Sequence, residues 1–184
     1  AEDTGRLDTL FAASRFDSVA YVDIELETAR AKEWILDEFR QNDVRLIISH
    51  HDFETTPDED ILTAIFDQCA GYGDIAKVAT YPTDLSDTLT LLSALHTATE
   101  SGLDAAGIAM GEIGSHTRVV GHIYGSKLGY APLLSDDSEY APGQISLGKL
   151  AALIEATRID GTKLERIEAI EDDVTVPSEL TLPN

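Results

Sequence analysis

The sequence is poor in cysteine and in basic residues, and each shortage excludes a class of protein. Its 184 residues include one cysteine, Cys69, so a disulfide framework and a cysteine-based metal site are both excluded. Lysine and arginine together number 13 against 34 aspartate and glutamate residues, which gives a formal net charge of −21. That charge excludes a protein that binds nucleic acid by neutralising phosphates, and it disfavours binding to anionic membranes.

Long apolar runs are also missing from the sequence. No run approaches the length of a membrane span, and no secretory signal peptide is visible. The sequence therefore predicts a cytoplasmic protein. A hydrophobic content of 43% supplies a real core, and the length predicts one domain over residues 1–160, followed by an acidic tail over 161–184.

The acidic residues are dispersed along the chain rather than gathered in one block. Clusters such as Asp58-Glu59-Asp60 and Asp136-Asp137 fall on predicted exposed faces of different segments. A dispersed acidic surface with little lysine resembles proteins of salt-loving organisms, where dense salt screens the repulsion. An ordinary acidic mesophilic protein is the alternative.

Hydrophobic periodicity alternates between strand-like and helix-like segments. Period-two or continuous apolar runs predict strands over 19–26, 44–49, 75–80, 106–110 and 127–131, and helical spacing predicts helices over 4–15, 28–40, 58–69, 84–99, 116–123 and 146–157. Such alternation predicts parallel strands covered by helices. No glycine-rich fingerprint follows a strand, so dinucleotide binding is not indicated.

Polar residues whose side chains could take part in catalysis fall at the carboxyl ends of the predicted strands. Glu25, His51 and Glu112 close or directly follow an apolar run, and Lys77 lies within one. The carboxyl edge of the sheet is where βα-barrel enzymes build their sites. The predicted fold is therefore α/β, a (β/α)8 TIM barrel. Because about six segments are strand-like, and a helix comes first, the barrel is expected to lack its N-terminal one or two strands.

Lys77 lies inside the apolar run 74–80, where lysine is rarely placed. Burial of an ammonium without a partner is expensive and favours the neutral amine, which can attack a carbonyl group. The sequence therefore points to imine chemistry. The alternative for Lys77 is an ion-paired barrel lysine, and the alternative for His51 is a structural histidine bonded to a backbone carbonyl.

Four stretches carry a resemblance to a known family. They are SHHDF at 49–53 with Thr56-Pro57, GDIAKVA at 73–79, MGEIG at 110–114 with Arg118, and YGS at 124–126, later followed by APGQI at 141–145. In this order they resemble type I 3-dehydroquinate dehydratase, the Schiff-base dehydratase of the shikimate pathway. The resemblance runs from about residue 4 to residue 157, and it implies a βα barrel without metal or cofactor.

The resemblance also implies a mechanism. Lys77 would form an imine with the C3 carbonyl of 3-dehydroquinate, a small-molecule substrate. His51 would act as general base and acid: it would help to make and break the imine, take a proton from C2 and assist loss of the C1 hydroxyl. The products would be 3-dehydroshikimate and water, and a homodimer is a further expectation.

Further residues match the family's binding positions. Arg118 would bind the substrate carboxylate. The other expected contacts are the amide of Gln144, the pocket walls Met110 and Tyr130, the acids Asp23 and Glu25 at their strand end, and Tyr140, which stands where the family often has serine. Further acids and arginines of the family's first two strands have no match in the sequence.

Two other functions remain open on the sequence alone. A different class I Schiff-base enzyme, such as an aldolase, would also need a buried lysine, although Arg118 with Gln144 argues against it. An inactive barrel fragment is the second alternative, because a barrel without all its strands has an open edge.

The acidic composition makes the fold dependent on salt. Repulsion among like charges weakens the compact state in dilute buffer and is screened at molar ionic strength. We expect the melting temperature, followed by circular dichroism, to rise between dilute buffer and molar KCl. A melting temperature that does not change with salt contradicts the halophilic interpretation.

Overall fold

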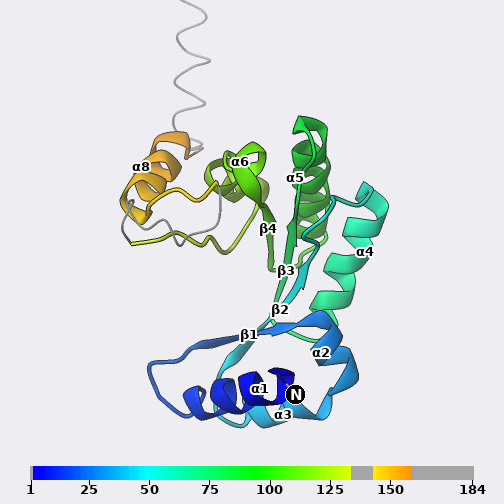
Figure 1. Cartoon of the computed structure of the whole chain (residues 1–184), viewed down its shortest axis with the longest axis vertical. Coiled ribbons are helices and arrows are strands. Elements are labelled where there is room, and N and C mark those ends of the chain that lie inside the picture. The colour runs from blue at the N-terminus through cyan, green and yellow to red at the C-terminus, as the bar shows by residue number, and fades with distance from the viewer. Residues whose placement is uncertain (1, 134–142, 159–184) are drawn as a thin grey trace, which may run out of the picture.

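A parallel β-sheet of four strands forms the centre of the molecule (Figure 1). The computed structural model describes residues 2–133 and 143–158. The strands β1 (Tyr21–Glu25), β2 (Arg45–His51), β3 (Ile75–Thr80) and β4 (Ala105–Ala109) pair in the order of the chain. Every neighbouring pair is parallel, which confirms the predicted succession of βα units.

Helices connect and cover these strands. They are α1 (Glu2–Ala13), α2 (Leu26–Ala31), α3 (Trp34–Arg40), α4 (Glu59–Ala70), α5 (Leu85–Glu100), α6 (Gly111–Gly114), α7 (Thr117–Val120), the 3-10 helix η1 (Gly121–Tyr124) and α8 (Leu147–Thr157). In Figure 1, α4 and α5 stand side by side along one side of the sheet, and α8 lies on the other side, beyond α6.

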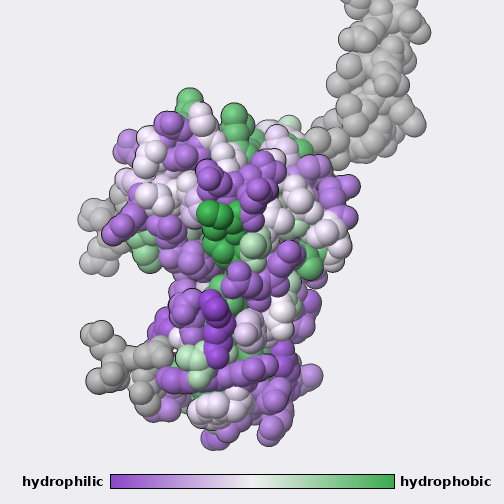
Figure 2. All heavy atoms as spheres, turned by 90° about the vertical axis from the view of Figure 1, so that its right-hand side faces the viewer, coloured by the Kyte–Doolittle hydropathy of each residue, from purple (hydrophilic) through white to green (hydrophobic). Residues whose placement is uncertain are grey.

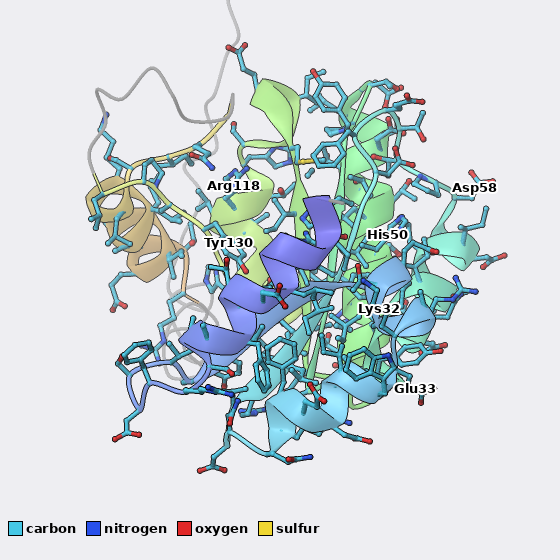
Figure 3. All side chains as sticks on the ribbon, turned by 60° about the horizontal axis from the view of Figure 1, so that its bottom comes forward. Lys32, Glu33, His50, Asp58, Arg118 and Tyr130 are labelled. Carbon is cyan, nitrogen blue, oxygen red and sulfur yellow. The ribbon has the colours of Figure 1, made fainter. Side chains whose placement is uncertain are left out.

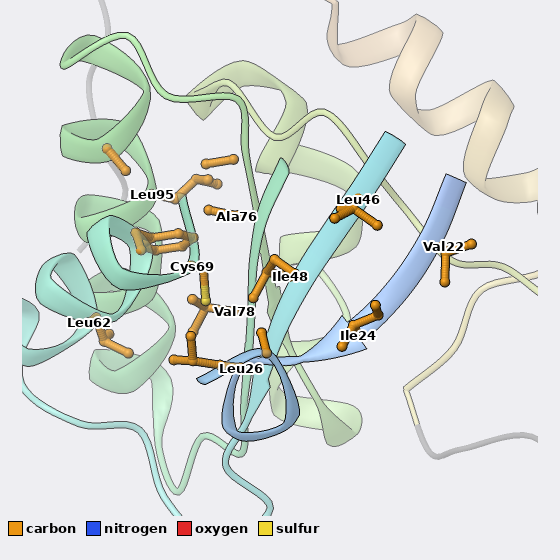
Figure 4. Close-up of a cluster of buried hydrophobic side chains, with 14 of the residues drawn as sticks. Val22, Ile24, Leu26, Leu46, Ile48, Leu62, Cys69, Ala76, Val78 and Leu95 are labelled. Carbon is orange, nitrogen blue, oxygen red and sulfur yellow. The ribbon is translucent and has the colours of Figure 1, made fainter. Parts of the chain in front are cut away.

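Alternation along the strands gives the sheet two different faces. Val22, Ile24, Leu46 and Ile48 are at most 3% exposed and belong to the main apolar cluster, together with residues of α4 and α5 such as Leu62 and Leu95 (Figure 4). The residues between them in β1 and β2, among them Asp23, Glu25, Ser49 and His51, point to the opposite face. The apolar core and the polar candidate site therefore occupy opposite faces of one sheet.

Local sequence signals explain where the longest helix begins. Asp84 is the N-cap of α5, and its Oδ1 accepts hydrogen bonds from the backbone N–H groups of Ser86 and Asp87 at 2.7 and 3.1 Å. The buried face of α5 then follows helical spacing through Leu91, Leu92 and Leu95. This helix was predicted within one or two residues of its observed ends.

Two predictions about secondary structure were wrong. Residues 28–40 form two helices, since α2 ends at Ala31 and α3 begins at Trp34, and the break lets both short helices pack on β2. Residues 127–131 form no strand; a single ladder-like bond joins the Lys127 N–H to the Ala105 carbonyl. The described residues thus contain four of the five strands whose ranges the sequence predicted.

The segment after η1 leaves the sheet edge and crosses its polar face. Tyr130 comes from this segment, and its hydroxyl reaches Asp23 on β1, the strand at the far edge of the sheet. The physical reason for the missing strand follows from this path, because a chain that crosses the face cannot also continue a ladder beside β4.

No helix in the described ranges, 2–133 and 143–158, is long and apolar enough to cross a membrane. The predicted acidic tail over 161–184 lies outside the described residues. The division of the chain at residue 160 stays a prediction.

Burial makes Cys69 a reporter of the intact core. Cys69 lies on α4, is 0% exposed, and burial raises its pKa to about 12. We expect iodoacetamide to alkylate Cys69 at least about a hundredfold more slowly in the folded protein at molar KCl than in denaturant. Glutathione in the same solutions is the control for reagent reactivity. Equal rates in both solutions would show that α4 does not stay packed.

Candidate active site

The polar face of the sheet brings Lys77 into an ion pair with Asp23. In the register of the sheet Glu25 lies opposite Ser49, and Ser49 lies opposite Lys77. The Lys77 side chain is 8% exposed, and its Nζ donates a hydrogen bond of 2.8 Å to Asp23 Oδ2 from two strands away. The small Ser49 on the intervening strand leaves room for the lysine to reach across.

Tyr130 lies over this ion pair. Lys77 Nζ is 4.8 Å from the centre of the Tyr130 ring, and the Tyr130 hydroxyl donates to Asp23 Oδ2 at 3.3 Å. Burial, followed by the negative charge of Asp23, raises the pKa of Tyr130 to about 12, so the hydroxyl remains a donor. Lysine, carboxylate and phenol therefore form one connected group.

His51 and Glu25 form a second pair at the carboxyl ends of β2 and β1. His51 Nδ1 lies 2.8 Å from Glu25 Oε1, without the alignment of a hydrogen bond. The imidazole also stacks on Phe53 with ring centres 5.7 Å apart and planes at 8°. His51 is thus held by a carboxylate and an aromatic ring, whereas the alternative from the sequence paired it with a backbone carbonyl.

Arg118 and Gln144 both carry buried polar atoms without a protein partner. Arg118 Nη1 donates to the Tyr130 carbonyl at 3.3 Å, while Arg118 Nε and Gln144 Oε1 are buried and make no hydrogen bond. Burial lowers the pKa of Arg118, which stays a cation at neutral pH. Figure 3 shows Arg118 and Tyr130 close together, with His50 and Lys32 on the other side of the view.

A close backbone approach fixes the start of the segment that carries Gln144. Gly143 has a φ of 79°, and a Cβ at this position would collide with the carbonyl of Gly111. Gly111 is the first residue of α6 and directly follows Met110 at the end of β4. The glycine therefore brings Gln144 to the carboxyl edge of the sheet.

The remaining predicted residues lie in different places. Met110 lines a hollow of about 440 Å³ with Tyr81, Gly111 and Glu112, and the Lys77–Asp23 pair is not part of its lining. Tyr140 lies outside the described residues. Among the described residues no cluster of three or more histidine, cysteine or acidic residues could hold a metal ion.

Sequence reasoning missed Ser49 as a site residue. Its hydroxyl is buried without a hydrogen-bond partner, and it lies between Glu25 and Lys77 in the register. An unpartnered buried hydroxyl costs about 1–3 kcal/mol, which makes it a candidate ligand contact. Ser49 and His51 are two residues apart on one strand, so the alternation of side chains along a strand could have placed Ser49 on the same face as His51.

The fold and the site together define a class of protein, a parallel βα protein whose polar face is organised round one buried lysine. Comparison with known proteins narrows this class. The family model for type I 3-dehydroquinase matches residues 1–160, and the chain belongs to this family.

Relatives from salt-loving organisms match most of the chain. The 3-dehydroquinate dehydratase of Halobacterium salinarum is 38% identical over 160 residues, which cover 84% of this chain and 70% of that protein. The enzyme of the same name from Haloquadratum walsbyi is 37% identical over 166 residues, which cover 89% of this chain and 66% of that protein. A halophilic character, expected from the acidic composition, fits these relatives.

A solved structure confirms the fold class. The crystal structure of 3-dehydroquinate dehydratase from Geobacillus kaustophilus matches with a TM-score of 0.75 and 30% identity. The match covers 83% of this chain and 59% of that one. The chain thus spans less than two thirds of this solved protein, and its four strands represent part of a TIM barrel.

The Lys77–Asp23 pair makes a prediction about stability. Asp23→Asn leaves a buried ammonium without its counter-ion, and we expect a loss of about 1–3 kcal/mol in the free energy of unfolding. This loss is smaller than that for a fully buried ion pair, because the Asp23 side chain is 31% exposed and solvent screens its charge. Lys77→Met in the same background should recover most of this loss. Urea unfolding of both single variants and the double variant at constant molar KCl measures the coupling free energy between Lys77 and Asp23. Additive effects of the two substitutions contradict a stabilising pair.

Proposed function

We propose that this chain carries out the reaction of a type I 3-dehydroquinate dehydratase, the conversion of 3-dehydroquinate into 3-dehydroshikimate and water. One observation carries the proposal: Lys77 is 6% exposed on the polar face of the sheet, with its Nζ held by Asp23. A nearly buried amine beside a base is suited to attack a ketone.

Imine formation is the first step of the proposed reaction. Asp23, 2.8 Å from Lys77 Nζ, is the nearest acceptor for the proton that the ammonium must lose. The free amine then adds to the C3 carbonyl of the substrate, and loss of water from the adduct leaves a protonated imine. The positive nitrogen withdraws electrons and makes the neighbouring C2–H bond acidic.

His51 completes the elimination in this proposal. The neutral imidazole takes the proton from C2, and the resulting enamine expels the hydroxyl group from C1 as the double bond moves. The same imidazolium returns its proton to the leaving oxygen, which departs as water. Glu25, 2.8 Å from Nδ1, stabilises the imidazolium between the two transfers. Hydrolysis of the imine then consumes the water that its formation released.

The unpartnered groups supply binding for a substrate that carries a carboxylate and hydroxyl groups. Arg118, whose Nε is buried and unpaired, would bind the carboxylate, and Gln144 Oε1 would accept from a hydroxyl. Tyr130 would form a wall beside Lys77, and Met110 a wall at the end of β4. A contact from Tyr140 stays a prediction.

The proposal includes a setting for the enzyme. It acts in the cytoplasm as a homodimer on a small-molecule substrate, with no metal or cofactor. The net charge of −21 argues against nucleic acid and anionic membranes as partners.

Trapping the imine tests the proposal directly. Borohydride is added at molar KCl with 3-dehydroquinate present, and peptide mass spectrometry locates the reduced adduct. We expect an adduct on Lys77 that depends on substrate and is lost in Lys77→Ala, together with turnover.

Lys149→Ala is the control, because Lys149 is an exposed residue of α8 and its loss should keep the adduct on Lys77. An adduct on another lysine, or turnover that survives in Lys77→Ala, rejects the imine mechanism. Trapping by a simple aldehyde or ketone and not by 3-dehydroquinate points to a different Schiff-base enzyme.

A further inference from the structure

Two hydrogen-bond donors share one oxygen atom at the centre of the site. Asp23 Oδ2 accepts from Lys77 Nζ at 2.8 Å and from the Tyr130 hydroxyl at 3.3 Å. A carboxylate that accepts a second hydrogen bond has its charge partly neutralised. It is therefore a weaker counter-ion for the first donor.

The geometry points to a specific role for the Tyr130 hydroxyl: through Asp23 it weakens the hold of Lys77 on its proton and so increases the share of free amine. This inference deepens the proposed function, on which it rests, because imine formation needs the amine and not the ammonium. Tyr130 is thus a positioning residue that acts on Lys77 through Asp23.

The ring of Tyr130 acts in the opposite direction to its hydroxyl. Lys77 Nζ lies 4.8 Å from the ring centre, at a distance where the aromatic face stabilises a cation. Phenylalanine at this position keeps the ring and removes the hydroxyl, whereas leucine removes both. The two substitutions therefore separate the two effects.

The contacts of the site separate the Tyr130 hydroxyl from the other charged groups of the polar face. Asp23 from β1 contacts Lys77, Glu25 and His51 pair with each other at the strand ends, and Arg118 from α7 contacts the backbone carbonyl of Tyr130 rather than its side chain. The neighbouring residue in the register of β4 is Ala106, which carries no charge. Loss of the hydroxyl thus changes one contact of the Asp23 carboxylate.

Competitive acetylation measures how strongly Lys77 retains its proton, and it needs no substrate. Wild-type protein and variants at molar KCl are treated with acetic anhydride from neutral to alkaline pH, below the range where Tyr130 ionises. Mass spectrometry of the Lys77 peptide gives its rate of labelling against pH. The reagent reacts with the free amine, so the profile reports how much amine is present.

We expect the profile of Tyr130→Phe to shift by about half a pH unit toward alkaline pH, which makes labelling about threefold slower below the midpoint. The labelling profile of Tyr130→Leu should lie at lower pH than that of Tyr130→Phe, because leucine also removes the ring that stabilises the ammonium. Tyr21→Phe is the matched control, because Tyr21 is 38% exposed against 41% for Tyr130 and its hydroxyl also contacts a charged side chain, Arg45. Its Lys77 profile should match wild type.

An unmoved midpoint in Tyr130→Phe, or one moved toward acid, overturns the inference. A rate that falls equally at every pH also overturns it, since that result describes a merely structural role. Borohydride trapping of the same variants with 3-dehydroquinate keeps the two proposals apart. A shifted acetylation profile without any trapped imine rejects the proposed function and leaves the role of Tyr130 standing.

Discussion

The ion pair between Lys77 and Asp23 is the interaction on which the rest of the site depends. The ammonium of Lys77, a residue that is 6% exposed, needs a counter-ion, and Asp23 supplies it from two strands away on the far edge of the sheet. The register, with Ser49 between the two strands, makes this reach possible. Tyr130, and through it Arg118, then assemble on the pair.

The two faces of the sheet divide stability from chemistry. Residues such as Ile24, Leu46 and Val78 pack against the helices, and the alternate positions carry the lysine, the histidine and three polar neighbours. A slip of one residue in register would exchange these faces. The apolar packing on one face therefore fixes the spacing of the charged groups on the other.

The chain belongs to the type I 3-dehydroquinase family, and the proposed function gives each of these groups a role. In that proposal, the lysine would form the imine, the histidine held by a carboxylate would transfer protons, and the buried arginine and amide atoms without partners would bind a hydroxylated carboxylic acid substrate. The hydroxyl of Tyr130 adds a second donor to Asp23, which a wall residue of purely apolar character would lack.

The sequence by itself determined the βα succession, the four strands of the sheet, the acidic composition, and Lys77 and His51 as candidates, because periodicity, composition and local motifs can be read along the chain. Only the tertiary structure decided that Lys77 pairs with Asp23, that His51 pairs with Glu25, and that residues 127–131 cross the polar face. The contacts of Asp23 with Lys77 and Tyr130 span 54 and 107 residues of sequence. Strand register and the path of the chain set such contacts, and no local pattern encodes them.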